Sequence, residues 1–203
     1  MALLSKSVLD AYQARKTTGA TGSGNYLNPR DITEGVKTRI TILGDESATG
    51  WIVWADSAAD ASKRVKLIFA SEPSKEDIIT RADEMNAVVQ PDARAQQWFG
   101  FFVYNFNAEA VQYFEATQRG LIEPIIEFLS DEEVESEPSL FDLVLSATGK
   151  GLDKKYSVLP MPGKRRTASI DKTIDAAWQK VLEDGADISV AVSGGDVWKG
   201  VPF

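Results

Sequence analysis

Short stretches of alternating apolar and polar residues recur along most of this chain. The clearest is residues 36–43, where Val36, Thr38, Ile40 and Ile42 share one side of the pattern. A period of two is typical of a strand with one buried face. The same pattern predicts a strand at residues 63–69, and strand-like apolar segments predict strands at 50–55, 98–105, 110–117, 141–147 and 156–159, with a turn at residues 44–46.

A second pattern, with apolar residues three to four positions apart, predicts helices. Ser74 is suited to cap a short helix that extends to residue 85, and Asp77 occupies its third helical position. Thr117 is a suitable cap for a helix that extends to residue 129, in which Pro124 is tolerated only near the first turn. Two further amphipathic helices are predicted at residues 4–16 and 170–182.

About seven short strands with one central helix predict a mainly β fold. A parallel sheet would need a crossover helix after nearly every strand, so a small closed or half-closed barrel fits better. Among small barrels, the OB-fold binds oligonucleotides across its strand face. The predicted organisation is an N-terminal arm with a flexible linker (residues 1–24), an OB-fold-like β-barrel core with a few peripheral α-helices (25–166) and a C-terminal helix and tail (167–203).

Composition narrows the chemistry that the chain can perform. It has 203 residues, 43% hydrophobic and 26% charged, which is typical of a soluble globular protein. No apolar run approaches the ~20 residues of a membrane helix, and the N-terminus lacks the pattern of a secretory signal. The absence of cysteine and histidine excludes disulfides, zinc sites with thiolate or histidine ligands, and Ser-His-Asp or Cys-His catalysis. We therefore expect a cytoplasmic protein that is not an enzyme and has no cofactor.

Charge is segregated along the sequence, although the net charge is −8. Residues 127–137 contain six acidic residues and no basic one, whereas residues 150–166 contain six basic residues and one acidic one. Segregated charge permits a positive groove on an acidic protein. The alternative for both runs is ordinary solvated surface, and the acidic run has no EF-hand spacing that would indicate a calcium site.

The strand that begins at Trp98 is unusually aromatic. Trp98, Phe102 and Tyr104 share one face with Gly100, whose missing side chain would leave space for a flat base between rings. Stacking of an unpaired base on such a ring is worth roughly 1–3 kcal/mol. The alternative is that both faces are buried, the outer one by the N-terminal arm or by residues 71–97.

A cationic turn complements these rings. Lys150 lies between two glycines in Thr148-Gly-Lys-Gly, so the backbone there can approach a phosphate closely. The turn is not a Walker A loop, which needs Gly-x-x-x-x-Gly-Lys-Ser/Thr. Lysines beside stacking rings are typical of surfaces that bind single-stranded nucleic acid. The candidate contacts are Lys37, Arg39, Trp54, Lys66, Trp98, Phe102, Tyr104, Tyr113, Lys150, Lys154, Lys155, Tyr156, Lys164, Arg165 and Arg166.

Three segments together resemble a group of bacteriophage single-stranded-DNA-binding proteins that have an OB-fold core. They are residues 98–105, the helix after Thr117, and residues 140–162 with the motif Gly151-Leu-Asp-Lys-Lys-Tyr-Ser-Val-Leu-Pro. That group is distantly similar to the T4-type helix-destabilising protein. The resemblance covers roughly residues 36–165, and the last motif is its most specific part.

The resemblance implies sequence-tolerant binding of single-stranded DNA during phage DNA replication or recombination, in the cytoplasm of the host cell. It implies Lys154 and Tyr156 as DNA contacts. The T4-type protein holds a zinc ion with cysteine and histidine ligands, which this chain lacks. Either packing replaces the metal here, or the kinship is limited to the barrel.

The two ends of the chain indicate partners. The apolar side of the helix predicted at residues 4–16 could dock on a neighbouring subunit and make binding cooperative. The final Val201-Pro-Phe resembles the tail with which bacterial proteins of this role recruit replication partners, although Lys199 and the single Asp196 depart from its acidic run.

The main alternative function is a structural or protein-interaction module, such as a virion component. It would use the aromatic face as a protein interface, where tryptophan and tyrosine are also favoured. A carboxylate-dependent enzyme has the least support, because nothing in the sequence singles out a pair of carboxylates.

Overall fold

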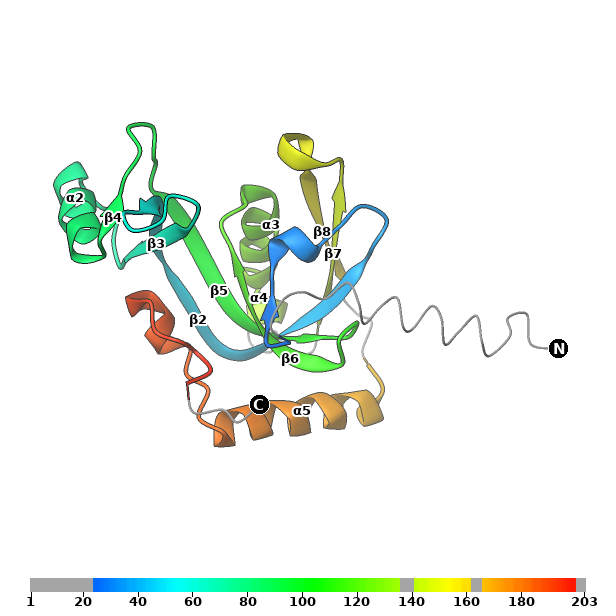
Figure 1. The fold of residues 1–203 in the computed structure, drawn as a ribbon. Helices are drawn as coiled ribbons and strands as arrows, with labels where there is room; N and C mark the ends of the chain where they lie inside the picture. Colours follow the sequence, from blue (N-terminus) through cyan, green and yellow to red (C-terminus); the bar gives the residue numbers. More distant parts are fainter. Residues whose placement is uncertain (1–23, 136–140, 162–165, 200–203) are drawn as a thin grey trace, which may run out of the picture.

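The computed structural model describes residues 24–135, 141–161 and 166–199, which form a curved sheet with helices on both sides (Figure 1). The strand order is β1-β6-β5-β2-β7-β8, and β3 and β4 both pair with β2. The pairs are antiparallel except for β1 with β6. The strands are β1 (Tyr26–Leu27), β2 (Thr38–Ser57), β3 (Arg64–Phe69), β4 (Ala87–Val88), β5 (Gln96–Asn105), β6 (Ala110–Ala116), β7 (Asp142–Thr148) and β8 (Lys155–Met161).

The predicted fold class is confirmed in part. The sheet is largely antiparallel, but strand makes up 38% and helix 30%, so the class is mixed α/β rather than mainly β. The sheet is open, and no closed barrel is detected among the described residues.

Strand β2 is the centre of the sheet, because it pairs with β3, β4, β5 and β7. The turn predicted at residues 44–46 is wrong, since β2 continues through them. Its register with β5 shifts between Leu43 and Ala48, and Gly44 has a φ of 72°. A bulge with a left-handed glycine bends a strand without ending it. The two strands predicted on either side of residues 44–46 are therefore one.

The predicted helices that fall within the described residues are observed. Helix α2 (Lys75–Glu84) begins at the predicted capping box between Ser74 and Asp77. Helix α3 (Arg119–Leu129) begins after Gln118 rather than Thr117, and Pro124 lies inside it, beyond the first turn. The remaining helical elements are α4 (Glu132–Glu135), α5 (Ala168–Glu183) and the 3-10 turns η1 (Pro29–Asp31), η3 (Gly151–Asp153) and η4 (Ser189–Ser193).

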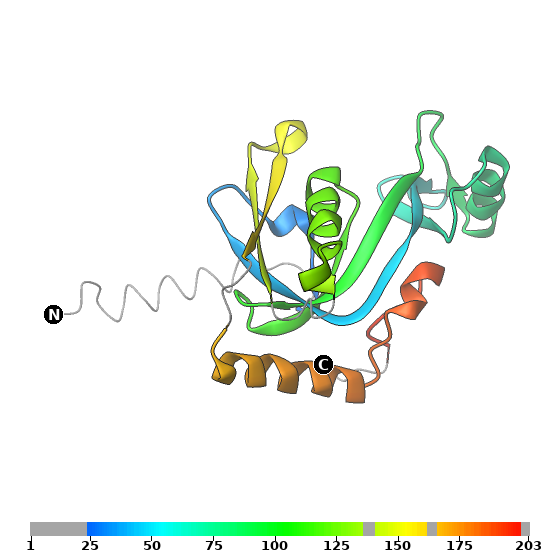
Figure 2. The same ribbon diagram turned by 180° about the vertical axis from the view of Figure 1, so that it is seen from behind.

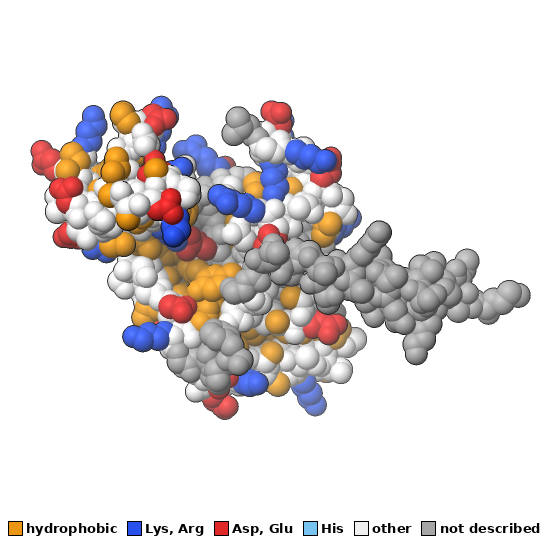
Figure 3. All heavy atoms as spheres, viewed as in Figure 1, with side chains coloured by type: hydrophobic (Ala, Val, Ile, Leu, Met, Phe, Trp, Pro, Cys, Tyr) orange, Lys and Arg blue, Asp and Glu red, His pale blue; other side chains and the backbone are white. Residues whose placement is uncertain are grey.

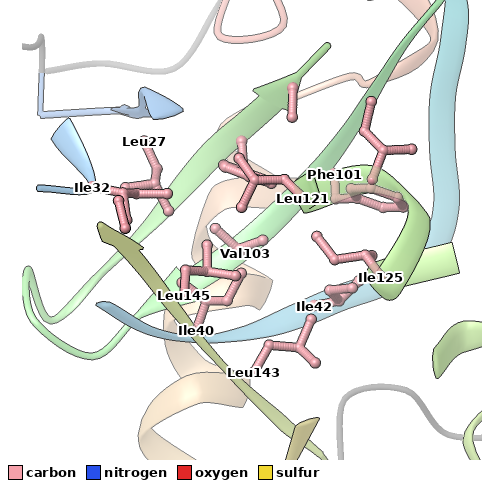
Figure 4. Close-up of a cluster of buried hydrophobic side chains, with 14 residues drawn as sticks. Leu27, Ile32, Ile40, Ile42, Phe101, Val103, Leu121, Ile125, Leu143 and Leu145 are labelled. Atoms are coloured by element: carbon pink, nitrogen blue, oxygen red, sulfur yellow. The ribbon is translucent and has the colours of Figure 1, made fainter. Parts of the chain in front are cut away.

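One face of the sheet packs against α3 and forms the main hydrophobic core (Figure 4). Phe101 and Val103 point from β5 into this core, as the alternation predicted, and they meet Leu121 and Ile125 of α3. Burial of these side chains stabilises the fold by roughly 1.5–3 kcal/mol each.

The opposite face of β5 and β6 is covered by residues 166–199, which contain α5 and η4 and which we call the C-terminal cover. Ile174 and Trp198 of this cover are buried against Phe102 and Tyr113 of the sheet in a second hydrophobic core. Both ribbon views show α5 along the outside of the sheet, on the side away from α3 (Figures 1 and 2). The two faces of β5 therefore belong to two different cores.

Two projections rise from the sheet on the same side of the molecule (Figures 1 and 2). The first consists of β3, α2 and β4, and a third cluster with Leu67 and Ala82 holds it together. The second is the β7–β8 hairpin, whose turn contains η3. The surface is hollowed between the two, and hydrophobic side chains gather at the base of the hollow (Figure 3).

Candidate nucleic-acid interface

The aromatic face consists of Trp98, Phe102 and Tyr104 of β5 and Tyr113 of β6. These four candidate contacts are only 0–6% exposed. The ring of Phe102 lies 5.3 Å from that of Trp178 and 5.2 Å from that of Trp198, both in the C-terminal cover. Of the two alternatives drawn from the sequence, burial is the one observed. The covering segment is residues 166–199 rather than residues 71–97, and the predicted arm lies outside the described residues. These rings cannot stack on bases while the cover is in place.

The space predicted above Gly100 is filled. A Cβ atom on Gly100 would lie 2.0 Å from the hydroxyl oxygen of Tyr113, so glycine is required there to admit the tyrosine ring. Burial raises the pKa of both Tyr113 and Tyr104.

This packed layer contains unpaired polar atoms. Among the described residues, the indole nitrogens of Trp98 and Trp198 and the hydroxyl of Tyr113 are buried without a hydrogen-bond partner. A buried donor without a partner costs about 1–3 kcal/mol. These unpaired polar atoms therefore make the second core less stabilising than an entirely apolar core of the same size.

The surface is open beside Tyr113, at the edge of the aromatic face, where residues of the C-terminal cover form one wall. A pocket of about 470 Å³, which we call the open pocket, lies there between β3, β6, α2 and the turn after η4. Lys66 forms one side of it, in an ion pair with Glu115, and its ammonium nitrogen lies 5.2 Å from the centre of the Trp98 ring. Trp54 is the cross-strand neighbour of Lys66 and is 38% exposed. The candidates Trp54 and Lys66 thus lie together.

Tyr26 stands at the rim of the open pocket and was not predicted. It is 39% exposed, and its ring meets that of Tyr113 edge to face at 6.0 Å. Its hydroxyl donates to Asp196 at 3.1 Å. Partial burial, reinforced by this carboxylate, raises the pKa of Tyr26 to about 12. Only two residues of β1 carry it, too few for periodicity to reveal.

Several candidate cations have carboxylate partners. Arg39 and Arg166 both bind Asp142, which is fully buried, and Arg166 also pairs with Asp171 at 2.8 Å. The Arg39 guanidinium lies 4.2 Å from the centre of the Phe106 ring. Through Asp142, Arg39 connects β2 to β7, and Arg166 connects α5 to β7. Their geometry is that of structural ion pairs rather than of open phosphate contacts.

The other candidate cations are distributed around the β7–β8 turn. Lys150 and Lys155 are exposed there, and Lys37 is exposed just before β2. A second pocket of about 410 Å³ lies between Lys150, Lys154 and Glu34. Lys164 and Arg165 lie outside the described residues, as do the predicted N-terminal arm and the final Val201-Pro-Phe.

The motif that carries the resemblance has a structural role in the β7–β8 hairpin. Lys154 donates to the carbonyl oxygens of Pro29 and Arg30 at 3.3 and 3.1 Å, and its ammonium lies 4.9 Å from the Tyr156 ring. Tyr156 donates its hydroxyl to Pro29 at 3.1 Å. The two side chains therefore tie η1 to β8.

Lys154→Ala is expected to lower the free energy of unfolding by about 1–2 kcal/mol, because it removes charge-assisted hydrogen bonds to two carbonyls. Lys155→Ala, the matched control at an exposed neighbour, is expected to change it by less than about 0.5 kcal/mol. Urea denaturation followed by circular dichroism measures both. Equal effects would show that the contacts of Lys154 do not stabilise the fold.

Three comparisons with known proteins give no relative for this chain. No family model matches the sequence, no curated protein matches it, and no solved structure matches the fold. Within the described ranges, no group of three or more acidic side chains is placed to hold a metal ion. None of the helices in the described part of the chain is long and apolar enough to cross a membrane.

Proposed function

We propose that this protein binds single-stranded DNA and performs no reaction on it. The observation that carries the proposal is the surface at the open pocket. Tyr26, Lys66 and Arg81 line this pocket, and the exposed ring of Trp54 lies beside Lys66 on the neighbouring strand. Exposed rings beside cations bind the flat faces of unpaired bases and the adjacent phosphates.

The strand connections support an OB-fold-like, partly open barrel as the finer description of the core. Strands β2, β5 and β6 are neighbours, β7 returns to pair with β2, and β8 pairs with β7. Helix α3 stands between β6 and β7. In an OB-fold, oligonucleotides bind across the second and third strands, between the loop after the first strand and the loop before the last. Here those loops correspond to the α2 projection and the β7–β8 turn.

The two projections supply a path for a strand. Arg81 and Lys66 lie on the side of the α2 projection, and Lys150 and Lys155 lie at the β7–β8 turn. The surface is hollowed between them (Figure 3). A strand that crosses this hollow would pass over the open pocket and meet lysines beyond it.

The test is fluorescence anisotropy with a labelled oligonucleotide of mixed sequence and a duplex of equal length. We expect tight binding of the single strand, weak binding of the duplex, and a slope of log K against log salt of about −0.7 for each phosphate contacted. Equal affinity for both forms would rule out stacking. Binding to neither would favour the alternative, a protein-interaction module in a virion or other assembly.

Trp54→Ala is expected to weaken single-strand binding by about 1–3 kcal/mol, because it removes one stacking ring. Trp54→Phe retains a flat ring and serves as the matched control, so it should keep most of the affinity. Affinities are measured by the same anisotropy titration. If both variants bind like the parent, the strand does not pass over this end of the aromatic face.

A further inference from the structure

The open pocket has polar groups that a phosphate-binding groove alone does not need. Glu115 and Lys66 form an ion pair on its wall, with side chains 27% and 25% exposed. A carboxylate repels phosphate, so Glu115 argues against a site for the backbone of a strand. An acceptor and a donor side by side instead match the edge of a nucleobase.

The rest of the lining is suited to a flat ring. Ile68, Met85 and Val197 supply apolar surface, and Tyr26 supplies an aromatic rim. Tyr113 lines the same pocket, is 3% exposed, and has a hydroxyl without a hydrogen-bond partner among the described residues. The volume of about 470 Å³ lies in the range of small-ligand sites.

We infer that the open pocket takes one unpaired nucleobase from the bound strand, and that Glu115 and Lys66 read its edge in favour of bases with an exocyclic amino group. This inference rests on the proposed function. It adds one selective position to binding that otherwise tolerates any sequence.

The chemical reason is the difference between an amino group and a carbonyl. A carboxylate only accepts hydrogen bonds, and the amino group of cytosine only donates, so Glu115 can accept from it while Lys66 donates to the adjacent ring nitrogen. Thymine has no amino group, and its single ring N–H lies between two carbonyl oxygens that a carboxylate repels. Thymine is therefore the disfavoured base.

The glycines after η4 make the pocket wall close-fitting. Gly194 has a φ of 80°, and a Cβ atom there would lie 3.3 Å from the end of Ile68. A Cβ atom on Gly195 would lie 2.9 Å from Val190. The backbone at Gly194 therefore lies close to Ile68 of β3, the strand that also carries Lys66.

The experiment compares oligo-dC with oligo-dT of equal length in the anisotropy assay, with the full chain. The parent protein is expected to prefer oligo-dC by at least about fivefold, the lower end of the discrimination that one good base contact provides. Glu115→Gln has an amide that both donates and accepts, so it should lose most of this preference. Glu123→Gln, an exposed residue of α3 with the same change of charge, should retain it.

A second readout locates the base and does not depend on a variant. Ultraviolet cross-linking of an oligonucleotide with 5-iododeoxycytidine, followed by mass spectrometry, should attach the base to Tyr26, Met85 or Tyr113. Cross-links confined to other residues would overturn the inference. Thermal melting of Glu115→Gln shows whether a lost preference reflects lost folding instead.

The outcomes separate this inference from the proposed function. Tight binding with equal affinity for oligo-dC and oligo-dT overturns the base pocket and leaves single-strand binding intact. Binding of neither oligonucleotide removes the proposed function. Titration with deoxycytidine monophosphate then decides whether the pocket takes a free nucleotide. Binding that is weakened by Glu115→Gln would support a base pocket. No binding would overturn the base pocket.

Discussion

Trp98→Ala is expected to lower the free energy of unfolding by about 3–5 kcal/mol, because it removes a large, fully buried ring and leaves a cavity in the second core. The partner rings on the C-terminal cover cannot refill that space, since α5 is also fixed at its N-terminal end by Arg166. Urea denaturation followed by circular dichroism gives the measurement.

Trp54→Ala is the matched control for this experiment. The same substitution at the partly exposed position of β2 should change stability by less than about 1 kcal/mol. The two tryptophans are therefore expected to have different roles: Trp98 contributes to the stability of the fold, and Trp54 contributes to the affinity for single-stranded DNA. A stability loss of equal size at both positions would contradict the burial of the aromatic face.

Asp142→Ala is expected to lower the free energy of unfolding by about 3–5 kcal/mol, because it breaks a buried ion-pair network. Its carboxylate is fully buried and binds Arg39 and Arg166, and the side chain of Arg166 is itself 3% exposed. The penalty comes mainly from Arg166, whose buried guanidinium loses the carboxylate of Asp142 while its pair with Asp171 remains.

Glu84→Ala removes a carboxylate from an exposed ion pair, that with Arg81 at 2.8 Å, and provides the comparison. Exposed pairs contribute about 0–1 kcal/mol, so this variant should melt close to the parent protein. Chemical denaturation of both variants in the same buffer tests the difference. Equal free energies of unfolding for the two variants would mean that the ion pairs of Asp142 do not stabilise the packing of α5.

Local patterns predicted the elements of this fold well. The strands β3 and β7 follow from alternation, and β5 and β6 follow from short runs of apolar and aromatic residues, because side chains of each strand lie in a hydrophobic core. The capping box of α2 was visible because Ser74 and Asp77 satisfy each other within one turn. Such features depend on residues that are close in sequence.

Features set by distant contacts could not be predicted. Gly44 is as compatible with a turn as with a bulge, and the pairing of β2 with β5 decides between them. The apolar side of α5 was recognised, but nothing near it in sequence indicates that it covers Phe102. Which surface a helix covers depends on the shape of the whole sheet.

The candidate site shows the same division. Lys66, which lines the open pocket, and its cross-strand neighbour Trp54 were found from the sequence. Glu115 and Tyr26 were missed because they reach the pocket from β6 and β1. Arg39 and Arg166 were grouped with the candidate cations because charge is visible in a sequence and ion pairing is not. Asp142 is 103 and 24 residues away from them.

The position of the cover at the end of the chain has a consequence for synthesis. A ribosome makes β5 and β6 before it makes α5, and translation proceeds at about 5–20 residues per second. For several seconds, the nascent chain therefore carries Trp98, Phe102 and Tyr113 without the segment that later buries them. During that interval these rings form an exposed apolar surface, which a chaperone could shield or a neighbouring nascent chain could bind. The synthesis of α5 and the residues that follow it thus ends the interval in which these rings are exposed and the risk of aggregation is greatest.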